Sequence, residues 1–231
     1  EVGRAEQFAQ EAVSIASELG DDRASAGALI ALGDVHSAQG NHELALTRYE
    51  EAVALRARLG DPLLMLDAVY NLGMAAFHAG DFGPAREAFD DALTQARDLG
   101  EAPYVAAAQL MLAQLDIGRG DPVIAATRAR ESLAAYSVLE DDRSRARCLV
   151  VLAAAAAAVG SLENAARLVG AAEAARGDED PDEYESPVLE RFVPALEARI
   201  GTASFRDLTA EGRTLQPRAF ELAIAATGTW T

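Results

Sequence analysis

Apolar and small residues recur along the chain with the three-to-four-residue spacing of a helix that is buried on one face. Two successive stretches show the spacing: Ile30, Leu32, Val35 and then Leu44, Ala45, Tyr49, Ala52, Val53. This period is typical of amphipathic α-helices, and the alternation expected of a half-buried strand does not occur. The pattern therefore predicts an all-α protein.

Glycine marks the predicted helix ends at a regular interval. The marks stand 20 residues apart (40 − 20 = 20), with position 140 as the gap: Gly20, Gly40, Gly60, Gly80, Gly100, Gly120 and Gly160. Except for Glu101, the residue after each glycine is a type that caps helix N-termini: Asp21, Asn41, Asp61, Asp81, Asp121 and Ser161. Asp141, which follows the gap at position 140, is of the same type. Glycine allows the left-handed turn that ends one helix, and the polar side chain accepts an N–H of the next. The chain is thus predicted to form helices of about 15 to 18 residues joined by tight turns.

Two helices in each repeating unit cannot bury their apolar faces alone, so neighbouring units are expected to stack into one continuous core. Particular positions recur from unit to unit. The first unit carries Leu32, Gly33, Ala45, Tyr49 and Ala52, and the second Leu72, Gly73, Ala85, Phe89 and Ala92. The third keeps Leu112 and Ala125 beside Ala113, Ala129 and Ser132, and the fourth keeps Leu152, Ala165 and Ala172 beside Ala153 and Val169.

These positions resemble the tetratricopeptide repeat, which carries Leu-Gly in its first helix and small, aromatic and small residues in its second. The resemblance implies a right-handed superhelical α-solenoid of antiparallel helix pairs, here with repeats of about 40 residues in place of 34. The predicted organisation is a second helix of an incomplete repeat at 1–20, then repeats at 21–60, 61–100, 101–140 and 141–176. An acidic loop at 177–186, capping helices at 187–226 and a tail at 227–231 follow.

The C-terminal part is expected to be less regular. Helices are predicted from about Ser186, with a kink or early break at Pro194, and then at 203–212 and 217–226. The acidic run at 177–185 has two interpretations, a solvated loop or a dock for a basic partner.

The segment after Gly160 is similar to the C-terminal end of the repeat region in actinobacterial ATPase-coupled transcriptional regulators of the LuxR-like and AfsR-like kinds. The residues that carry this similarity are Ala165, Ala166, Arg167, Leu168, Gly170, Ala171, Ala172, Glu173, Ala174, Phe205, Ala210, Glu211, Gly212, Arg213 and Leu215. In such regulators a nucleotide-binding switch domain usually precedes the repeats, and a DNA-binding helix-turn-helix often follows. Neither is recognised in these residues, so the similarity implies only the regulatory role of the repeats.

The resemblance also places side chains of each first helix on a concave surface, where tetratricopeptide proteins hold peptides or helices. The candidate groove residues are Ile30, Asp34, Asp67, Tyr70, Asn71, Met74, Phe77, Leu110, Gln114, Ile117 and Arg147. The middle of this set is apolar and aromatic, as partner sites are. The alternative is that these side chains pack between repeats or under the terminal helices. Acidic C-terminal tails are disfavoured as ligands, because only Asn71 and Arg147 approach the recurring basic and amide residues that a carboxylate clamp needs.

Charge excludes several functions. The chain has 37 acidic and 20 basic residues, a net charge of −17, and all its basic residues are arginine. This charge would repel a phosphate backbone, so direct nucleic-acid binding is not expected. Without lysine the chain has neither a P-loop cation nor a Schiff-base amine. No apolar run approaches the roughly 20 residues of a membrane span, and no leader is recognised, so a cytoplasmic location is expected.

Catalytic or metal-binding constellations are not found. His36, His42 and His78 have no accompanying cysteine, and ordinary surface or turn histidines are favoured over metal ligands. Cys148 lies in an apolar stretch, where an inert buried thiol is expected. We therefore expect no enzyme activity, no cofactor and no metal.

The sequence favours a regulatory binding module that receives a protein segment in the groove or on the convex face and passes the signal to an attached switch domain. The alternative is a sensor that holds a small effector inside the superhelix.

Overall fold

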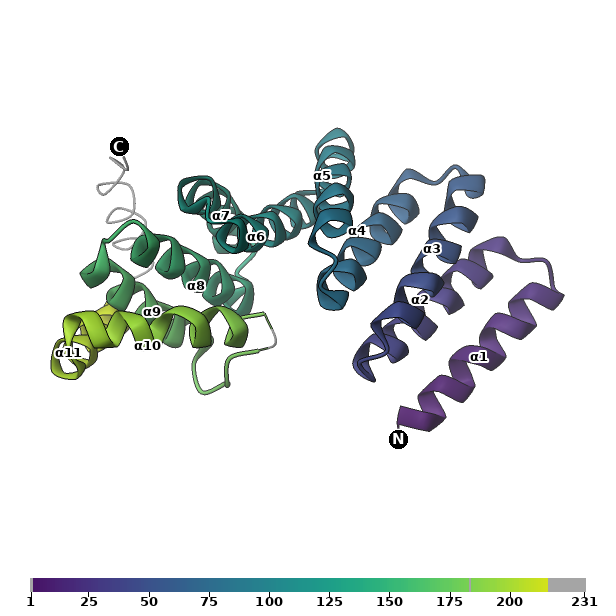
Figure 1. Cartoon of the computed structure of the whole chain (residues 1–231). Helices are drawn as coiled ribbons and strands as arrows, with labels where there is room; N and C mark the ends of the chain where they lie inside the picture. The colour runs from purple at the N-terminus through teal and green to yellow at the C-terminus, as the bar shows by residue number, and fades with distance from the viewer. Residues whose placement is uncertain (1, 183, 216–231) are drawn as a thin grey trace. The chain divides into compact units, whose positions relative to one another are not determined.

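The computed structural model describes residues 2–182 and 184–215, and its regular structure is α-helical (Figure 1). Its helices are α1 (Val2–Glu18), α2 (Asp22–Ala38), α3 (His42–Leu59), α4 (Pro62–Ala79), α5 (Phe82–Leu99), α6 (Ala102–Arg119), α7 (Pro122–Val138), α8 (Asp142–Ala158), α9 (Leu162–Arg176), α10 (Ser186–Ile200) and α11 (Thr202–Thr214). The all-α prediction is confirmed. The helix predicted at 217–226 and the tail at 227–231 lie outside the described residues.

The glycines that mark the helix ends have the left-handed backbone conformation that the sequence analysis predicted. All seven have a left-handed φ, between 64° and 86°. Position 140, the gap in the series, carries Glu140 with a φ of 55°, the one non-glycine residue of the described chain with a positive φ. The 20-residue period is therefore continuous in the backbone although it is interrupted in the sequence.

The predicted N-caps are confirmed at only some helices. Asp21, Asp61 and Asp141 accept backbone N–H groups at the starts of α2, α4 and α8. Asn41, Asp81, Asp121 and Ser161 make no capping hydrogen bond through their side chains. Before these helices the chain turns at the left-handed glycine that ends the preceding helix, without a side-chain hydrogen bond at the next helix start.

Helices that follow one another in the sequence pack side by side. The pairs α2 with α3, α4 with α5 and α8 with α9 are in extensive contact, and α2 also touches α4, so first helices of successive repeats meet. The chain forms two compact units, Glu1–Ala108 and Gln109–Thr231, called unit 1 and unit 2 below. Their boundary lies within α6 instead of at a predicted repeat boundary.

Small residues bring the helices of a pair close together. Ala45 and Ala52 of α3 are completely buried, as are their equivalents in α5. A Cβ added to Gly73 would lie 2.8 Å from the Phe89 ring, so the first helix fits against the aromatic residue only because it has glycine there. This contact supports the register that the sequence pattern predicted.

Helix α1 differs from the later second helices. Ala5 and Ala12 occupy the positions equivalent to Ala45 and Ala52 but are exposed, and Phe8 between them is 60 % exposed. Within the described residues α1 packs on α2 and carries no preceding helix on this face.

At the end of unit 2, α11 crosses α9 with its backbone almost in contact. A Cβ added to Gly170 would lie 2.0 Å from the backbone oxygen of Thr209, and one added to Gly212 would lie 2.0 Å from that of Arg167. Glycine is therefore required on both sides of the crossing. Helix α10 packs on α8, α9 and α11.

The early break expected at Pro194 is wrong, because α10 continues to Ile200. Pro194 and Glu190 are exposed, so water can reach the carbonyl group that the proline leaves without an N–H partner. None of the described helices combines the length and the hydropathy that crossing a membrane requires.

Candidate partner-binding surface

The apolar candidates of unit 1 lie along one side of α4. Tyr70, Met74 and Phe77 are each partly buried and follow a helical spacing. The Tyr70 ring packs 5.6 Å from the Phe89 ring and edge-on to Tyr104 at 5.8 Å, both between centroids. Tyr70 thus packs between helices, which is the alternative that the sequence left open for the groove residues. Met74 and Phe77 continue the surface along α4, away from the cluster of Tyr70, Phe89 and Tyr104.

The exposed end of this surface is aromatic. Phe77 lies 5.8 Å from Phe82 and 6.0 Å from His78, between ring centroids, and Phe82 is 58 % exposed. Sequence reasoning did not single out Phe82, although its place directly after the cap of α5 brings it next to the end of α4. We name the partly buried side chains Met74 and Phe77, together with Phe82, the α4 surface.

Asp67 has a structural role in this unit. Arg56, whose side chain is 8 % exposed, contacts Asp67 at 2.6 Å and donates to the carbonyl oxygen of Leu64 at 2.7 Å. The Tyr104 hydroxyl donates to the other Asp67 oxygen at 2.8 Å, and burial followed by this hydrogen bond raises the pKa of Tyr104 to about 12. Both Asp67 oxygens accept hydrogen bonds within the unit, although the side chain is still 34 % exposed, so a contact of Asp67 with a partner stays a prediction.

The remaining candidates of unit 1 lie on α2 and α4, two helices that touch. Asp34 on α2 is exposed and accepts a hydrogen bond from the Tyr49 hydroxyl. Ile30 packs partly against the core formed by Ala45, Tyr49 and Ala75, and Asn71 is half-buried on α4. Asp34 is therefore the exposed acidic group on the first helix that neighbours α4.

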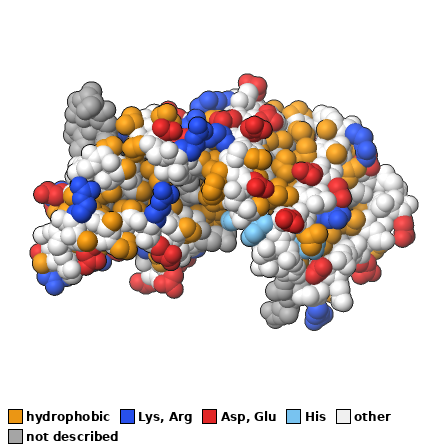
Figure 2. Space-filling view, in the orientation of Figure 1, with side chains coloured by type: hydrophobic (Ala, Val, Ile, Leu, Met, Phe, Trp, Pro, Cys, Tyr) orange, Lys and Arg blue, Asp and Glu red, His pale blue; other side chains and the backbone are white. Residues whose placement is uncertain are grey.

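Two of the three histidines lie against each other. His42 stacks on His78 with ring centroids 5.9 Å apart, whereas His36 is buried. Figure 2 shows histidine atoms gathered at one place on the visible face. Among the residues that the structure describes, no group of three or more histidine, cysteine or acidic side chains is placed to hold a metal ion.

In unit 2 two of the candidates on α6 are buried. Leu110 and Gln114 are only 3 % and 7 % exposed, and Ile117 is half-buried. The Gln114 amide donates to the carbonyl oxygen of Tyr184 at 3.5 Å, a long hydrogen bond. The expectation that Leu110 and Gln114 are open to a partner is therefore not met, because both side chains are buried and Gln114 contacts the loop after α9.

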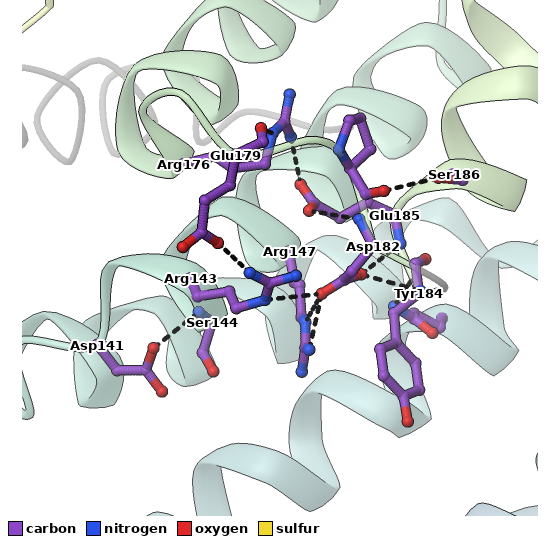
Figure 3. A network of polar contacts seen from close by, with 12 residues as sticks. Asp141, Arg143, Ser144, Arg147, Arg176, Glu179, Asp182, Tyr184, Glu185 and Ser186 are labelled. Atoms are coloured by element: carbon purple, nitrogen blue, oxygen red, sulfur yellow. Dashed lines mark hydrogen bonds and ion pairs between the residues drawn. The ribbon is translucent and has the colours of Figure 1, made fainter. Parts of the chain in front are cut away.

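Figure 3 shows how this loop is held. Asp182 accepts from Arg147 at 2.7 Å and from Arg143 at 3.3 Å, and the Arg147 guanidinium lies 4.5 Å from the centroid of the Tyr184 ring. Arg143 also pairs with Glu179. Arg147, predicted to face a partner, is thus occupied by the chain's own loop.

A buried ion pair anchors the end of the loop. Glu185 is completely buried and contacts Arg176, whose side chain is 8 % exposed, at 2.7 Å. Residues 178–181 of the acidic run are exposed, as the solvated-loop interpretation expected, whereas Asp182 and Tyr184 are half-buried and Glu185 is buried. The run also pairs with arginines of the same chain, and the docking of a basic partner stays a prediction.

The two buried carboxyl groups have pKa values shifted in opposite directions. Burial acts to raise the pKa of Asp182, but Arg147 and the backbone N–H groups of Tyr184 and Glu185 outweigh it, so this pKa is lowered. Burial raises the pKa of Glu185 despite the charge of Arg176. Asp182 is therefore the more firmly ionised of the two acids.

Cys148 has the properties of an inert thiol. It is completely buried, donates to the Ser132 hydroxyl at 3.3 Å, and has a pKa raised by burial to about 12. The thiolate that nucleophilic chemistry needs is thereby disfavoured, as the sequence predicted.

Unit 2 also contains a small pocket of about 330 Å³. Its walls are mainly apolar and come from α8 to α11, including Val150, Val169, Val193 and Phe205, with Arg176 at its edge.

A sequence model of the tetratricopeptide repeat matches residues 2–58 and 64–137, so the chain belongs to the tetratricopeptide repeat family. Domains of this family generally bind proteins or peptides and are typically non-catalytic. A search of curated proteins finds no match.

Two solved structures share the fold. One is the crystal structure of BtubC (BKLC) from P. vanneervenii, with a TM-score of 0.69 and 19 % identity, covering 100 % of this chain and 94 % of that chain. The other is a crystal structure of a Podosopora anserina putative kinesin light chain with nearly identical TPR-like repeats. Its TM-score is 0.62 at 21 % identity, covering 76 % of this chain and 86 % of that chain.

Proposed function

We propose that the chain is a protein-interaction module that binds a segment of a partner protein across the α4 surface. The observation that carries the proposal is the partly accessible pair Met74 and Phe77, extended by Phe82, on a helix that contacts another first helix. Apolar and aromatic side chains at helical spacing suit the anchors of a bound helix or extended peptide.

Charge suggests the chemistry of the partner. Asp34 is exposed on α2, and the net charge of the chain is −17. A segment with apolar anchors and flanking arginine or lysine would fit the surface and be attracted by the field of the protein.

The test uses a displayed library of random 12-residue segments selected on the wild-type chain. We expect the enriched segments to combine apolar anchors with basic residues, and their affinity to fall by at least about tenfold in Met74→Glu/Phe77→Glu. Leu44→Glu is the matched control, because Leu44 is an apolar residue of unit 1 that is 48 % exposed on α3. Equal affinity for the wild type and the double variant would move the site elsewhere.

We further propose that occupancy biases a switch domain attached in the full-length protein. The support is the similarity of residues 165–174 and 205–215 to the repeat regions of bacterial ATPase-coupled transcriptional regulators. The full reading frame tests it: a nucleotide-binding or helix-turn-helix domain should be encoded beside the repeats, and Met74→Glu/Phe77→Glu should alter its output. A reading frame without such a domain would refute this extension but leave the binding proposal intact.

A small-effector sensor is the second candidate, and the pocket of unit 2 is the observation that favours it. Its volume of about 330 Å³ is at the lower end of the range for ligand sites. A metabolite that raises the melting temperature of the wild type, but not of a variant with the pocket filled by Val193→Trp, would support this function. A metabolite that stabilises both equally does not bind in this pocket.

A further inference from the structure

The loop after α9 is bound to its own protein by contacts of the kind that recognise a peptide ligand. We propose that Gln114 on α6 and Arg143 and Arg147 on α8 form a recognition site for an acidic segment with tyrosine two residues after aspartate. Asp182 and Tyr184 of the same chain occupy this site. The site is in unit 2 and prefers acidic ligands, so it is independent of the function proposed for the α4 surface.

The protein side of the site is built on one helix face. Arg143 and Arg147 are four residues apart on α8, so their side chains project side by side. Arg145, between them in sequence, pairs instead with Asp142 of its own helix. Two of the three arginines in this turn thus converge on one carboxylate oxygen, Oδ2 of Asp182.

Three features of the bound segment are read at once. The Asp182 carboxylate takes both arginines, the Tyr184 ring lies against the face of the Arg147 guanidinium, and the Tyr184 carbonyl accepts from Gln114. Ion pairing supplies attraction, the cation–π contact selects an aromatic ring, and the backbone contact fixes the position of the chain. A segment that has only negative charge would satisfy the first feature alone.

Hydrogen bonds within the bound segment also fix its backbone conformation. The other Asp182 oxygen, Oδ1, accepts the backbone N–H groups of Tyr184 at 2.9 Å and Glu185 at 3.1 Å. The Glu185–Arg176 pair then fixes the segment where α10 begins at Ser186.

Tethering keeps the site filled. Because the loop is covalently attached, its local concentration at the site is on the order of millimolar. A free acidic segment must therefore be present at a higher concentration to displace the loop from the site. The site is therefore closed in the isolated chain and becomes available when the loop is displaced.

The experiment opens the site and supplies its occupant as a separate molecule. In Asp182→Ser/Tyr184→Ser the Glu185–Arg176 anchor is retained, and binding of a fluorescent peptide that copies residues 178–187 is measured at low ionic strength. We expect this variant to bind at least about tenfold more tightly than the wild type. Adding Arg147→Ala should abolish the gain, as should changing aspartate to asparagine or tyrosine to serine at the same positions of the peptide.

The control variant adds Arg206→Ala, which removes an exposed arginine of unit 2 whose side chain is 76 % exposed. It should bind as tightly as the opened variant. Absence of peptide binding by an opened variant with unchanged helicity and melting temperature would show that the loop is only a structural staple, and would overturn the proposal.

A second measurement uses the wild-type chain and decides the matter even if the opened variant does not fold. Millimolar peptide should increase deuterium exchange in the loop at 177–185, and the serine-substituted peptide should not. Unchanged exchange with the copied peptide would overturn the proposal.

Discussion

Two aromatic side chains set the distance between paired helices in unit 1. A Cβ added to Gly33 would lie 3.0 Å from the Tyr49 ring, and one added to Gly73 would lie 2.8 Å from Phe89. Phe89 is completely buried, so neighbouring side chains enclose its ring. Glycine is thus required at positions 33 and 73 because the aromatic rings lie close to the backbone, and not because the backbone is left-handed there.

Replacing Gly73 by leucine should overpack this contact and lower the free energy of unfolding by about 1 to 3 kcal/mol. Urea denaturation measures the change. Gly27→Leu is the control, because Gly27 lies in α2 with no atom near an added Cβ, and helix propensity should make that variant neutral or slightly more stable. Equal stability of Gly73→Leu and the wild type would mean that the assigned register is wrong.

Glu140 bears a conformational cost that glycine would relieve, because its φ is 55°. Glu140→Gly should raise the free energy of unfolding by about 0.5 to 1 kcal/mol, after allowance for the extra entropy that glycine loses on folding. The reverse change, Gly100→Glu, should lower it by a similar amount, since Gly100 has a φ of 75°. Thermal unfolding of both variants is the measurement, and a less stable Glu140→Gly would contradict this account of the turn.

At the scale of elements, ion pairs hold the loop between α9 and α10 against α8 and α9. Its contacts with α8 are ion pairs and hydrogen bonds, and Asp182 is 9 % exposed in its side chain. Because its pKa is lowered in the folded state, Asp182 stabilises the docked loop at pH values above its ordinary pKa, near 4. That contribution is lost as the pH falls through the lowered value.

The loop should therefore stay docked from neutral pH to about pH 4 and be released below it. Glu185 acts in the opposite direction, because its raised pKa means that protonation favours the docked, buried form as the pH falls, so the release is driven by Asp182. The amide resonances of Tyr184 and Glu185, whose N–H groups donate to Asp182, report the transition in an NMR titration. Asp182→Asn should remove the transition, and a midpoint above the ordinary aspartate pKa would contradict the assignment.

The helices were predictable from sequence because their signals are local. Apolar period and terminal glycines act within a turn or two, so the predicted helices at 21–176 and at 203–212 agree with the observed ones. The Glu140 turn was not predictable, since its φ is imposed by flanking helices and not by its side chain. The contacts of Asp67 and Arg147 depend on which helices lie together; Arg147 and Asp182, for example, are 35 residues apart.

At the scale of the whole molecule, the chain presents two surfaces with different chemistry, each within its own unit. The α4 surface of unit 1 is apolar and aromatic, and the exposed Asp34 lies on α2, which touches α4. The site of Gln114, Arg143 and Arg147 in unit 2 is instead basic and already filled by Asp182 and Tyr184. A net charge of −17 favours basic partners for the molecule, so an acidic ligand of unit 2 needs the converging arginines to overcome the overall field.

The central claim is that the α4 surface receives the partner segment, and deuterium exchange with and without a library-selected segment tests it most directly. The account predicts protection in α2 and α4, loss of that protection in Met74→Glu/Phe77→Glu, and its retention in Leu44→Glu. Protection confined to α8–α11, or unchanged in the double variant, would contradict it.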